Sequence, residues 1–399
     1  MGNALVALGG AFLAAGLLAR LGSRVGLPTI PFFMAAGILF GPNTPGLVLV
    51  DRPEDLELFA AVGLIMLLFH LGLEFSLGDL VSGGPRLVGA GAMYIGLNVG
   101  GGLAFGLLLG WGLAEALVIA GAVGISSSAI VTKVLIDLER LANSETRLIL
   151  GITVVQDLFL ALYLALLQPV LGEVSGGMEA FLLVGRAFLF LLALFTIARF
   201  GASYAGKLLG SGDDEELLTV VFVGLAIVVA GLAAEIGVSE AIGAFMVGLI
   251  LAETKQVGQI QRLVLPLRDA FAAVFFFVFG LSIDPSTLGP VALPVAIAVG
   301  LTLVLNLVAG VLCSAINGFG RRQASNLTFT LLGRGEFSLI LASLAAAAGL
   351  DGRVGPFVAL YVLVLALGSP ILASRSRWLA RLLPSRMFPL RTRMKEVRA

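Results

Sequence analysis

Two polar side chains, Gln156 and Asp157, lie side by side in a stretch from Glu145 to Gln168 that is otherwise almost wholly apolar. A carboxylate at the depth of a bilayer costs about 3 kcal/mol or more, so its default interpretation is a functional site. Such a carboxylate can hold either a proton or a dehydrated monovalent cation, and this mutual exclusion is sufficient for exchange. Gln156 points about 100° away from Asp157 on a helix, so it is better placed to support a neighbouring helix than to bind the ion.

Three consecutive serines, Ser126, Ser127 and Ser128, interrupt an earlier apolar stretch. Their hydroxyls can bind a hard monovalent cation, and backbone carbonyls join them if the helix is unwound there. Serines also permit close packing of membrane helices, which is the structural alternative. Ser128, together with Asp157, is the foremost candidate for the cation site, and Thr132 joins them only if the interruption ends before it.

A further polar site, far away in the sequence, contains Arg334 and Glu336 between glycines. Residues two positions apart do not share a face of a helix, and neither charge is tolerated unpaired in lipid. The pattern therefore indicates an interrupted helix that these charges lock in place, rather than direct ion ligands. Glu74, at the end of another apolar stretch, could attract cations or simply extend towards the membrane surface.

The composition identifies a membrane protein: 59% of the residues are hydrophobic, 13% are charged, and the mean hydropathy is +1.06. A single cysteine, Cys313, excludes disulfides within the chain, and the single histidine, His70, leaves a zinc site unsupported. We therefore expect no cofactor, and the net charge of zero gives no indication of a nucleic-acid partner. His70 could sense pH, although a packed histidine is the simpler interpretation.

Apolar runs long enough to cross a layer of about 30 Å recur along the whole chain. We predict thirteen spans, with the second and ninth short for a crossing, at residues 3–21, 28–42, 56–75, 86–110, 114–136, 145–168, 178–199, 215–235, 238–253, 266–283, 290–317, 324–349 and 354–373.

Lysines and arginines predict the orientation of these spans. One set of alternate segments, together with the basic tail at 374–399, contains 21 of them, whereas the other set contains 2. This asymmetry places the C-terminus in the cytoplasm and the N-terminus outside. The tail suits a membrane surface or a partner protein.

The two ends of the chain resemble each other. Residues 15–22 match residues 230–237 at five of eight positions, and three shorter matches follow in the same order at offsets between 208 and 215 residues. Because seven spans separate the matches, the halves 1–168 and 215–373 are predicted to be inverted repeats joined by a linker helix at 178–199. Inverted repeats are typical of secondary transporters, whose sites lie where helices break at mid-membrane.

The combination of these motifs resembles the monovalent cation:proton antiporters of the Kef potassium-efflux type. It consists of Ser126–Val131, followed by Gln156-Asp157, with Gly72-Leu73-Glu74 before them and Gly333–Phe337 after them. Ser128 occupies the place of the family's threonine. The resemblance covers essentially the whole chain and implies thirteen helices, crossed broken helices five and twelve, a homodimer, and a core that moves against a dimerisation domain.

The resemblance also implies that Asp157 carries both the ion and the proton. Electrogenic sodium-exporting relatives have two adjacent aspartates and a lysine in span ten, whereas here Gln156 precedes Asp157 and Phe271–Ile283 contains no lysine. We therefore expect electroneutral K⁺/H⁺ exchange. Kef-type proteins usually carry a cytoplasmic nucleotide-binding regulatory domain, so we expect it here as a separate subunit, unless it was lost or removed.

Three alternatives remain. Hydroxyl and carboxylate ligands do not separate K⁺ from Na⁺, so a Na⁺/H⁺ antiporter is possible. A cation channel would need a filter sequence, which is not apparent. An intramembrane hydrolase would need a Ser/His pair or two catalytic aspartates within the spans, but His70 is the lone histidine and Asp157 the lone mid-span aspartate.

Overall fold

The computed structural model describes residues 2–24, 27–74, 77–171, 215–235, 240–252, 254 and 256–383. Within these ranges the regular structure is helical, as the sequence predicts. Nine helical stretches there are long and apolar enough to cross a membrane, and three shorter apolar helices accompany them. The predicted linker helix at 178–199 and residues 384–399 of the tail lie outside the described residues, so the number of thirteen spans stays a prediction.

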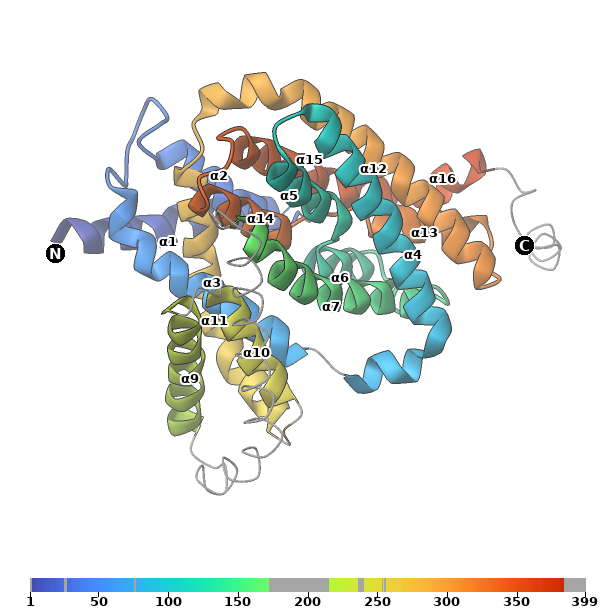
Figure 1. Ribbon diagram of the computed structural model, residues 1–399, viewed down its shortest axis with the longest axis horizontal. Coiled ribbons are helices and arrows are strands. Elements are labelled where there is room, and N and C mark those ends of the chain that lie inside the picture. The colour runs from blue at the N-terminus through green and yellow to red at the C-terminus, as the bar shows by residue number, and fades with distance from the viewer. Residues whose placement is uncertain are drawn as a thin grey trace.

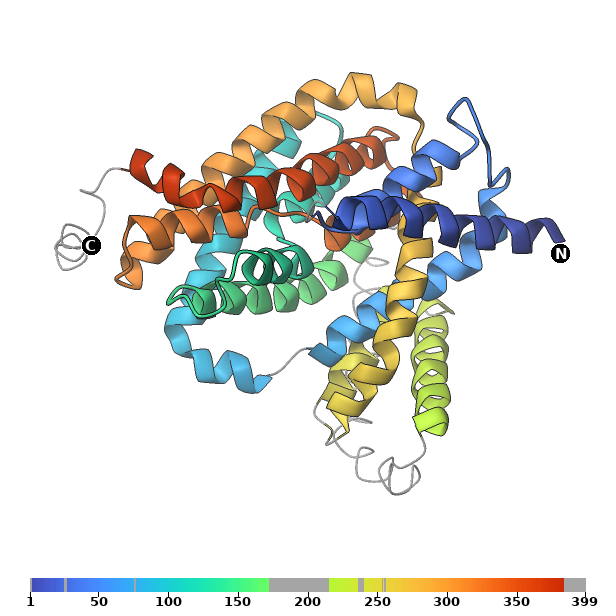
Figure 2. The same cartoon turned by 180° about the vertical axis from the view of Figure 1, so that it is seen from behind.

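One group of helices, which we name the panel, packs mainly within itself. It lies on the left and lower left in Figure 1 and is seen from behind in Figure 2. Its members are α1 (Gly2–Ser23), α2 (Ile30–Phe40), α3 (Glu57–Glu74), α9 (Glu215–Glu235), α10 (Glu240–Ala252) and α11 (Val257–Leu281).

The second group, which we name the bundle, contains two helices that are each broken in the middle. The first broken helix consists of α5 and α6, and the second of α13 and α14. The bundle comprises α4 (Leu77–Leu109), α5 (Leu113–Gly124), α6 (Ser128–Asp137), α7 (Thr146–Leu171), α12 (Leu288–Ile316), α13 (Arg321–Thr330), α14 (Glu336–Ala347), α15 (Val354–Ser374) and the short α16 (Ser376–Leu379).

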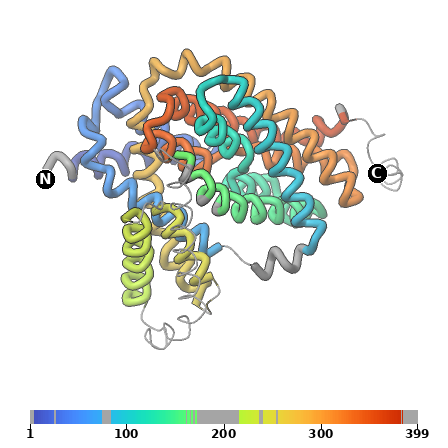
Figure 3. Tube along the Cα trace, viewed as in Figure 1, coloured from blue at the N-terminus to red at the C-terminus, as the bar shows by residue number. Residues whose placement is uncertain are grey.

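Each group combines segments from both halves of the chain. In Figure 3 the early helices α1–α3 lie beside the later helices α9–α11, and α4–α7 lie beside α12–α15. This mixing is what an inverted repeat produces when its two copies interlock. The repeat boundaries at 168 and 215 themselves remain predictions.

Glycines allow the panel helices to approach closely at two related places. Gly37 of α2 faces Gly280 of α11, and a Cβ on Gly37 would lie 2.9 Å from the Gly280 Cα. Gly72 of α3 faces Gly248 of α10, and a Cβ on Gly248 would lie 2.8 Å from the Gly72 Cα. Gly37 and Gly248 are 211 residues apart, and Gly72 and Gly280 are 208 apart, which are the offsets of the repeat. The two crossings are therefore equivalent in the two copies.

The second and ninth predicted spans are indeed short, with 11 residues in α2 and 13 in α10. At 1.5 Å per residue, helices of this length reach about 16–20 Å, well short of a hydrocarbon layer of about 30 Å. The close glycine crossings pair each of them with one long helix. Each short helix is thereby supported by a neighbour that does span the layer.

The tenth span was predicted to begin at residue 266, but α11 begins at Val257. The segment before Pro266 contains polar residues such as Gln259, Gln261 and Arg262. They are accommodated because the Gln261 side chain donates a hydrogen bond of 2.7 Å to the carbonyl oxygen of Leu73, at the C-terminal end of α3. This bond satisfies a carbonyl that the last turn of α3 leaves free.

Replacing Gly72 by valine tests the crossing of α3 and α10. The new side chain would meet backbone atoms, with its Cβ 2.7 Å from the Leu249 nitrogen, and backbone cannot yield as a side chain can. We expect a loss of about 1–3 kcal/mol in stability, measured as a lower unfolding temperature in detergent. The control is Gly96→Ala on an open face of α4, where no atom lies within 4 Å of the new Cβ. Equal unfolding temperatures for the two variants would contradict the crossing.

Candidate functional site

Two broken helices cross within the bundle. The first break spans residues 125–127 between α5 and α6, and the second spans residues 331–335 between α13 and α14. The Ser127 backbone nitrogen donates a hydrogen bond of 2.9 Å to the carbonyl oxygen of Gly333, which ties the two breaks together. Gly335 must lack a side chain, since a Cβ there would lie 2.6 Å from the Ser127 Oγ. The interruptions predicted in both spans are therefore present and in contact.

Arg334 satisfies the carbonyl ends at this crossing. Its side chain is fully buried, and its Nε and Nη2 donate hydrogen bonds of 3.1 and 2.6 Å to the carbonyl oxygen of Val123, in the last turn of α5. Its Nη1 donates to the carbonyl oxygens of Leu331 and Leu332, at 2.9 and 3.1 Å, at the end of α13. The guanidinium thus lies where two helix C-termini concentrate partial negative charge, which is a favourable place for a cation.

Glu336 occupies the opposite kind of helix end. It is the first residue of α14, and its Oε2 accepts a hydrogen bond of 2.8 Å from the Ser127 Oγ at the start of α6. Ser127 also caps α6, because its Oγ accepts a hydrogen bond of 3.3 Å from the Ile130 nitrogen. A carboxylate beside helix N-termini is stabilised by their partial positive charge. Arg334 and Glu336 therefore have separate partners.

Asp157 on α7 faces the first residue of α6. The Ser128 Oγ lies 3.4 Å from Oδ1 and 3.3 Å from Oδ2 of Asp157. Both residues line a cavity of about 240 Å³, together with Glu74, Thr132 and Thr153. Thr132 lies in the second turn of α6, since the helix resumes at Ser128. This arrangement offers a carboxylate and several hydroxyl oxygens to a small cation.

Gln156 and Ser126 lie behind this cavity rather than in its lining. Gln156 is fully buried, and its Nε2 donates hydrogen bonds of 3.1 Å to the Gly124 carbonyl oxygen and 3.3 Å to the Ser126 Oγ. The Ser126 Oγ donates to the Leu331 carbonyl oxygen at 2.8 Å. These two side chains therefore satisfy the ends of α5 and α13 and hold the crossing against α7.

Sequence reasoning missed Tyr94, which belongs to the same network. Its hydroxyl donates a hydrogen bond of 2.7 Å to Oδ1 of Asn306 and lies 3.4 Å from the Ser126 Oγ. Asn98 and Asn306 are 208 residues apart and so occupy equivalent positions in the two repeats. Of these two side chains, that of Asn306 reaches the crossing, where it donates a hydrogen bond of 3.2 Å to the Leu331 carbonyl oxygen. A lone tyrosine hydroxyl in the middle of an apolar span was the signal available in the sequence.

A larger cavity of about 460 Å³ adjoins the first one and shares Glu74, Ser128 and Thr132 with it. Glu336 also lines this cavity. At its edge, the Nδ1 of His70 lies 3.3 Å from the Arg268 Nη1 and 3.4 Å from the Glu74 Oε1. The two cavities together connect Asp157 with the end of α3 that carries Glu74.

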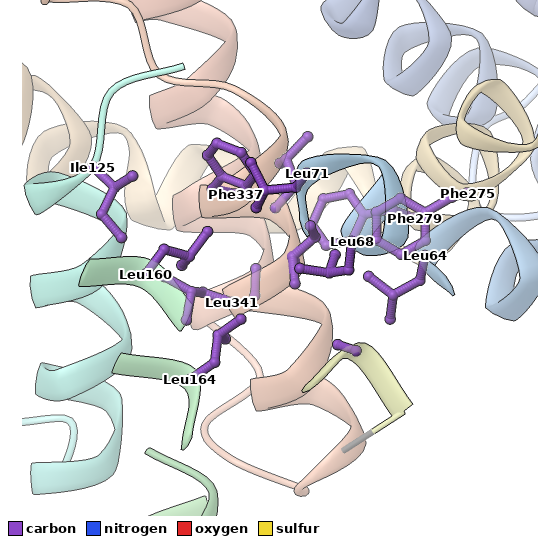
Figure 4. Close-up of a cluster of buried hydrophobic side chains, with 14 of the residues drawn as sticks. Leu64, Leu68, Leu71, Ile125, Leu160, Leu164, Phe275, Phe279, Phe337 and Leu341 are labelled. Atoms are coloured by element: carbon purple, nitrogen blue, oxygen red, sulfur yellow. The ribbon is translucent and has the colours of Figure 1, made fainter. Parts of the chain in front are cut away.

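A third cavity, of about 730 Å³, lies at the other end of the same helices. Along α3, residues 60, 61 and 64 line it, whereas residues 67, 70, 71 and 74 line the cavity of about 460 Å³. Leu68 of α3 and Leu341 of α14 lie between the two cavities and are almost fully buried. Figure 4 shows these side chains packed with Phe275, Phe279 and Phe337. Among the described residues, Asp157 therefore faces the cavities on the Glu74 side, and an apolar layer lies between these and the cavity at the other end.

Comparisons with known proteins identify relatives of this chain. The family model described as the transmembrane sodium/hydrogen exchanger matches residues 10–374. The chain is 40% identical over 382 residues to the K⁺/H⁺ antiporter subunit KhtU of Bacillus subtilis, covering 94% of each chain. It is 29% identical to the ammonium/H⁺ antiporter subunit AmhT of Alkalihalophilus pseudofirmus, covering 87% of this chain and 86% of that one.

A solved structure shows the same fold. The sodium proton antiporter MjNhaP1 from Methanocaldococcus jannaschii at pH 8 matches with a TM-score of 0.69 at 15% identity. The match covers 93% of this chain and 98% of that one.

Replacing Arg334 by glutamine tests the role of its guanidinium at the crossing. The variant leaves buried carbonyls at the ends of α5 and α13 without a charged donor, so we expect a loss of about 3 kcal/mol or more in stability. The unfolding temperature and the monodispersity of the purified protein in detergent measure this loss. Arg353→Gln is the matched control, because that arginine is exposed and its pair with Asp351 contributes about 1 kcal/mol at most. An Arg334→Gln protein as stable as the control variant would refute the role.

Proposed function

Because the chain belongs to the family of transmembrane sodium/hydrogen exchangers, we propose that it exchanges K⁺ for H⁺ across the membrane by alternating access. The observation that carries the proposal is the Asp157 carboxylate beside the Ser128 hydroxyl, in a cavity lined by residues of α3, α6, α7 and α10. A protonated Asp157 presents a neutral group to the cavity, whereas an ionised Asp157 attracts a cation. One site thus carries the two ions in alternation.

The charges around Asp157 favour a bound cation only when the proton has left the carboxylate. Glu336 and Glu74 line the same connected cavities and add negative charge near Asp157. An ionised Asp157 without a bound cation would therefore meet repulsion from both acids. Either proton or cation binding relieves that repulsion, which links the two events.

The division into panel and bundle supports alternating access. The apolar layer around Leu68 and Leu341 closes one side, while the cavities containing Glu74 open the other. Side chains of both the panel and the bundle form this layer. A movement of the bundle along the panel would therefore carry Asp157 to the other side of it. A cation channel, the alternative of another class, would need a path that is open at both ends at once.

The choice of K⁺ follows the relative KhtU, which is named as a K⁺/H⁺ antiporter subunit. Na⁺ is the second candidate, because the ligand types do not separate the two ions and a K⁺ site differs mainly in size. The charge asymmetry further supports a cytoplasmic C-terminus and an N-terminus outside. The open cavities at the Glu74 end of α3 would then face the cytoplasm.

The quaternary organisation is also part of the proposal. Both KhtU and AmhT are named as subunits, which supports a separate regulatory partner, here proposed to be cytoplasmic and nucleotide-binding. The panel would supply the homodimer contact, because it lies to one side of the bundle (Figure 1). In this arrangement the bundle, which contains Asp157, stays free to move relative to the panel.

The central test replaces Asp157 by asparagine, which is nearly isosteric but cannot bind a proton or a cation by charge. We expect proton flux in proteoliposomes to fall to background, read by an internal pH dye after K⁺, Na⁺ or choline is added outside with the membrane potential clamped. Asp51→Asn, in an exposed position on the loop between α2 and α3, serves as the matched control and should transport normally. Retained K⁺-driven flux in Asp157→Asn would remove the proposal, and flux driven only by Na⁺ would change the ion.

The stoichiometry has its own test. With one titrating carboxylate the exchange is one for one, so an imposed membrane potential of either sign should leave the initial rate unchanged. Glu336 is a buried carboxylate in the larger, adjoining cavity, and its hydrogen bond from Ser127 should keep it in one charge state throughout the cycle. A rate that depends on potential, and loses this dependence in Glu336→Gln, would contradict electroneutral exchange.

A further inference from the structure

The loop that joins α6 to α7 holds one arginine, Arg140, in a fixed position. Glu139 adopts a left-handed conformation with φ of 54°, which costs a residue with a side chain about 1–2 kcal/mol. The Arg140 backbone nitrogen donates a hydrogen bond of 2.8 Å to the Leu135 carbonyl oxygen, and its own carbonyl oxygen accepts one of 2.6 Å from the Thr146 hydroxyl. The end of α6 and the start of α7 thus determine where Arg140 lies.

Within the described part of the chain, the guanidinium of Arg140 makes no direct ion pair, and its buried Nη1 has no hydrogen-bond partner. The Arg140 side chain is only 6% exposed. Glu145 is the nearby acid, but its oxygens accept hydrogen bonds from Asn143, Ser144 and Asn326 at 3.2, 3.2 and 2.5 Å. A buried arginine without a paired anion is strongly unfavourable, so the position indicates a missing anionic group.

A second arginine is brought to the same place by α16. Asn326 of α13 contacts Glu145 on one side and accepts a hydrogen bond of 2.6 Å from the Ser376 hydroxyl on the other. Burial lowers the pKa of Arg140, the charge of Arg377, the residue after Ser376, lowers it further, and the charge of Glu145 offsets part of this effect. Two like charges are therefore held together although each repels the other.

Exposed apolar side chains follow both arginines in the chain. Leu141, after Arg140, is 55% exposed, and Trp378, after Arg377, is 60% exposed. Tryptophan is typical of the interface between hydrocarbon and headgroups, and basic residues at that level attract anionic lipids. Charge and apolar surface side by side match the two parts of a phospholipid, whereas a free phosphate ion would use only the charge.

We infer that Arg140 and Arg377 form a binding site for the phosphate of an anionic phospholipid at the membrane surface of the bundle. The lipid phosphate supplies the anion that Arg140 lacks and relieves the repulsion between the two guanidinium groups. Its acyl chains lie along the exposed Leu141 and Trp378. The site is separate from the cavities around Asp157 and requires no transported ion.

The position of the site connects it to transport. The loop of Arg140 joins α6, which begins with Ser128, to α7, which carries Asp157. A lipid bound there would hold the ends of these two helices together. It would thereby stabilise the geometry in which the hydroxyl and the carboxylate face each other.

The test uses the full chain in a neutral detergent and measures its unfolding temperature with added phosphatidylglycerol, phosphatidylcholine or inorganic phosphate. We expect phosphatidylglycerol to raise the unfolding temperature by several degrees, with little effect from the other two, because only a ligand of the folded state stabilises it. Arg140→Gln and Arg377→Gln should each lose at least half of this rise. Arg147→Gln, an exposed arginine in the first turn of α7, is the matched control and should keep it.

Each other outcome overturns the lipid site. An equal rise in Arg140→Gln and in the unmodified chain would place the lipid elsewhere. Equal stabilisation by inorganic phosphate would assign the arginines to a free anion. Stabilisation by none of the three would indicate an acidic partner protein instead. If Arg140→Gln does not fold, Arg377→Gln decides the question, because Arg377 is exposed and its removal leaves no buried group unpaired.

Discussion

Four helix ends meet at membrane depth in this protein, and the rest of the site depends on how they are satisfied. An interrupted helix leaves carbonyls free on one side of the break and amides on the other, and lipid offers them no partner. The Arg334 side chain donates four hydrogen bonds to the carbonyl ends of α5 and α13. Ser127 and Glu336 serve the opposite ends. With the backbone satisfied in this way, Asp157 and Ser128 remain available to an ion.

The same constraint explains why Arg334 and Glu336 do not pair with each other. Helix dipoles favour a cation at a C-terminus and an anion at an N-terminus, and the crossing separates these two environments. Each residue therefore sits where the local field suits its charge. Glu336 lines the larger cavity together with Arg268, and it adds a carboxylate near Asp157 besides that of Glu74.

Packing at two glycine crossings and packing in the apolar layer have different consequences. A Cβ at Gly72 or Gly280 would collide with backbone, so the panel helices are held at one separation and form a rigid surface. The layer between panel and bundle consists of flexible leucine and phenylalanine side chains instead (Figure 4). Such an interface can slide without breaking hydrogen bonds, which suits the relative movement that alternating access requires.

Much of this fold can be predicted from the sequence, because few backbone structures are stable within a bilayer. The apolar runs predict the spans, the repeated offsets predict paired crossings, and a polar run such as Ser126–Ser128 in an apolar helix predicts a break. Asp157 also stands out, since a carboxylate is rare at that depth. Only the tertiary structure decided which oxygens gather there. It placed Gln156 and Ser126 behind the cavity, added Tyr94, and left the Nη1 of Arg140 without a hydrogen-bond partner among the described residues. These are contacts between residues up to hundreds of positions apart, and hydropathy and spacing, which are properties of one helix at a time, carry no information about them.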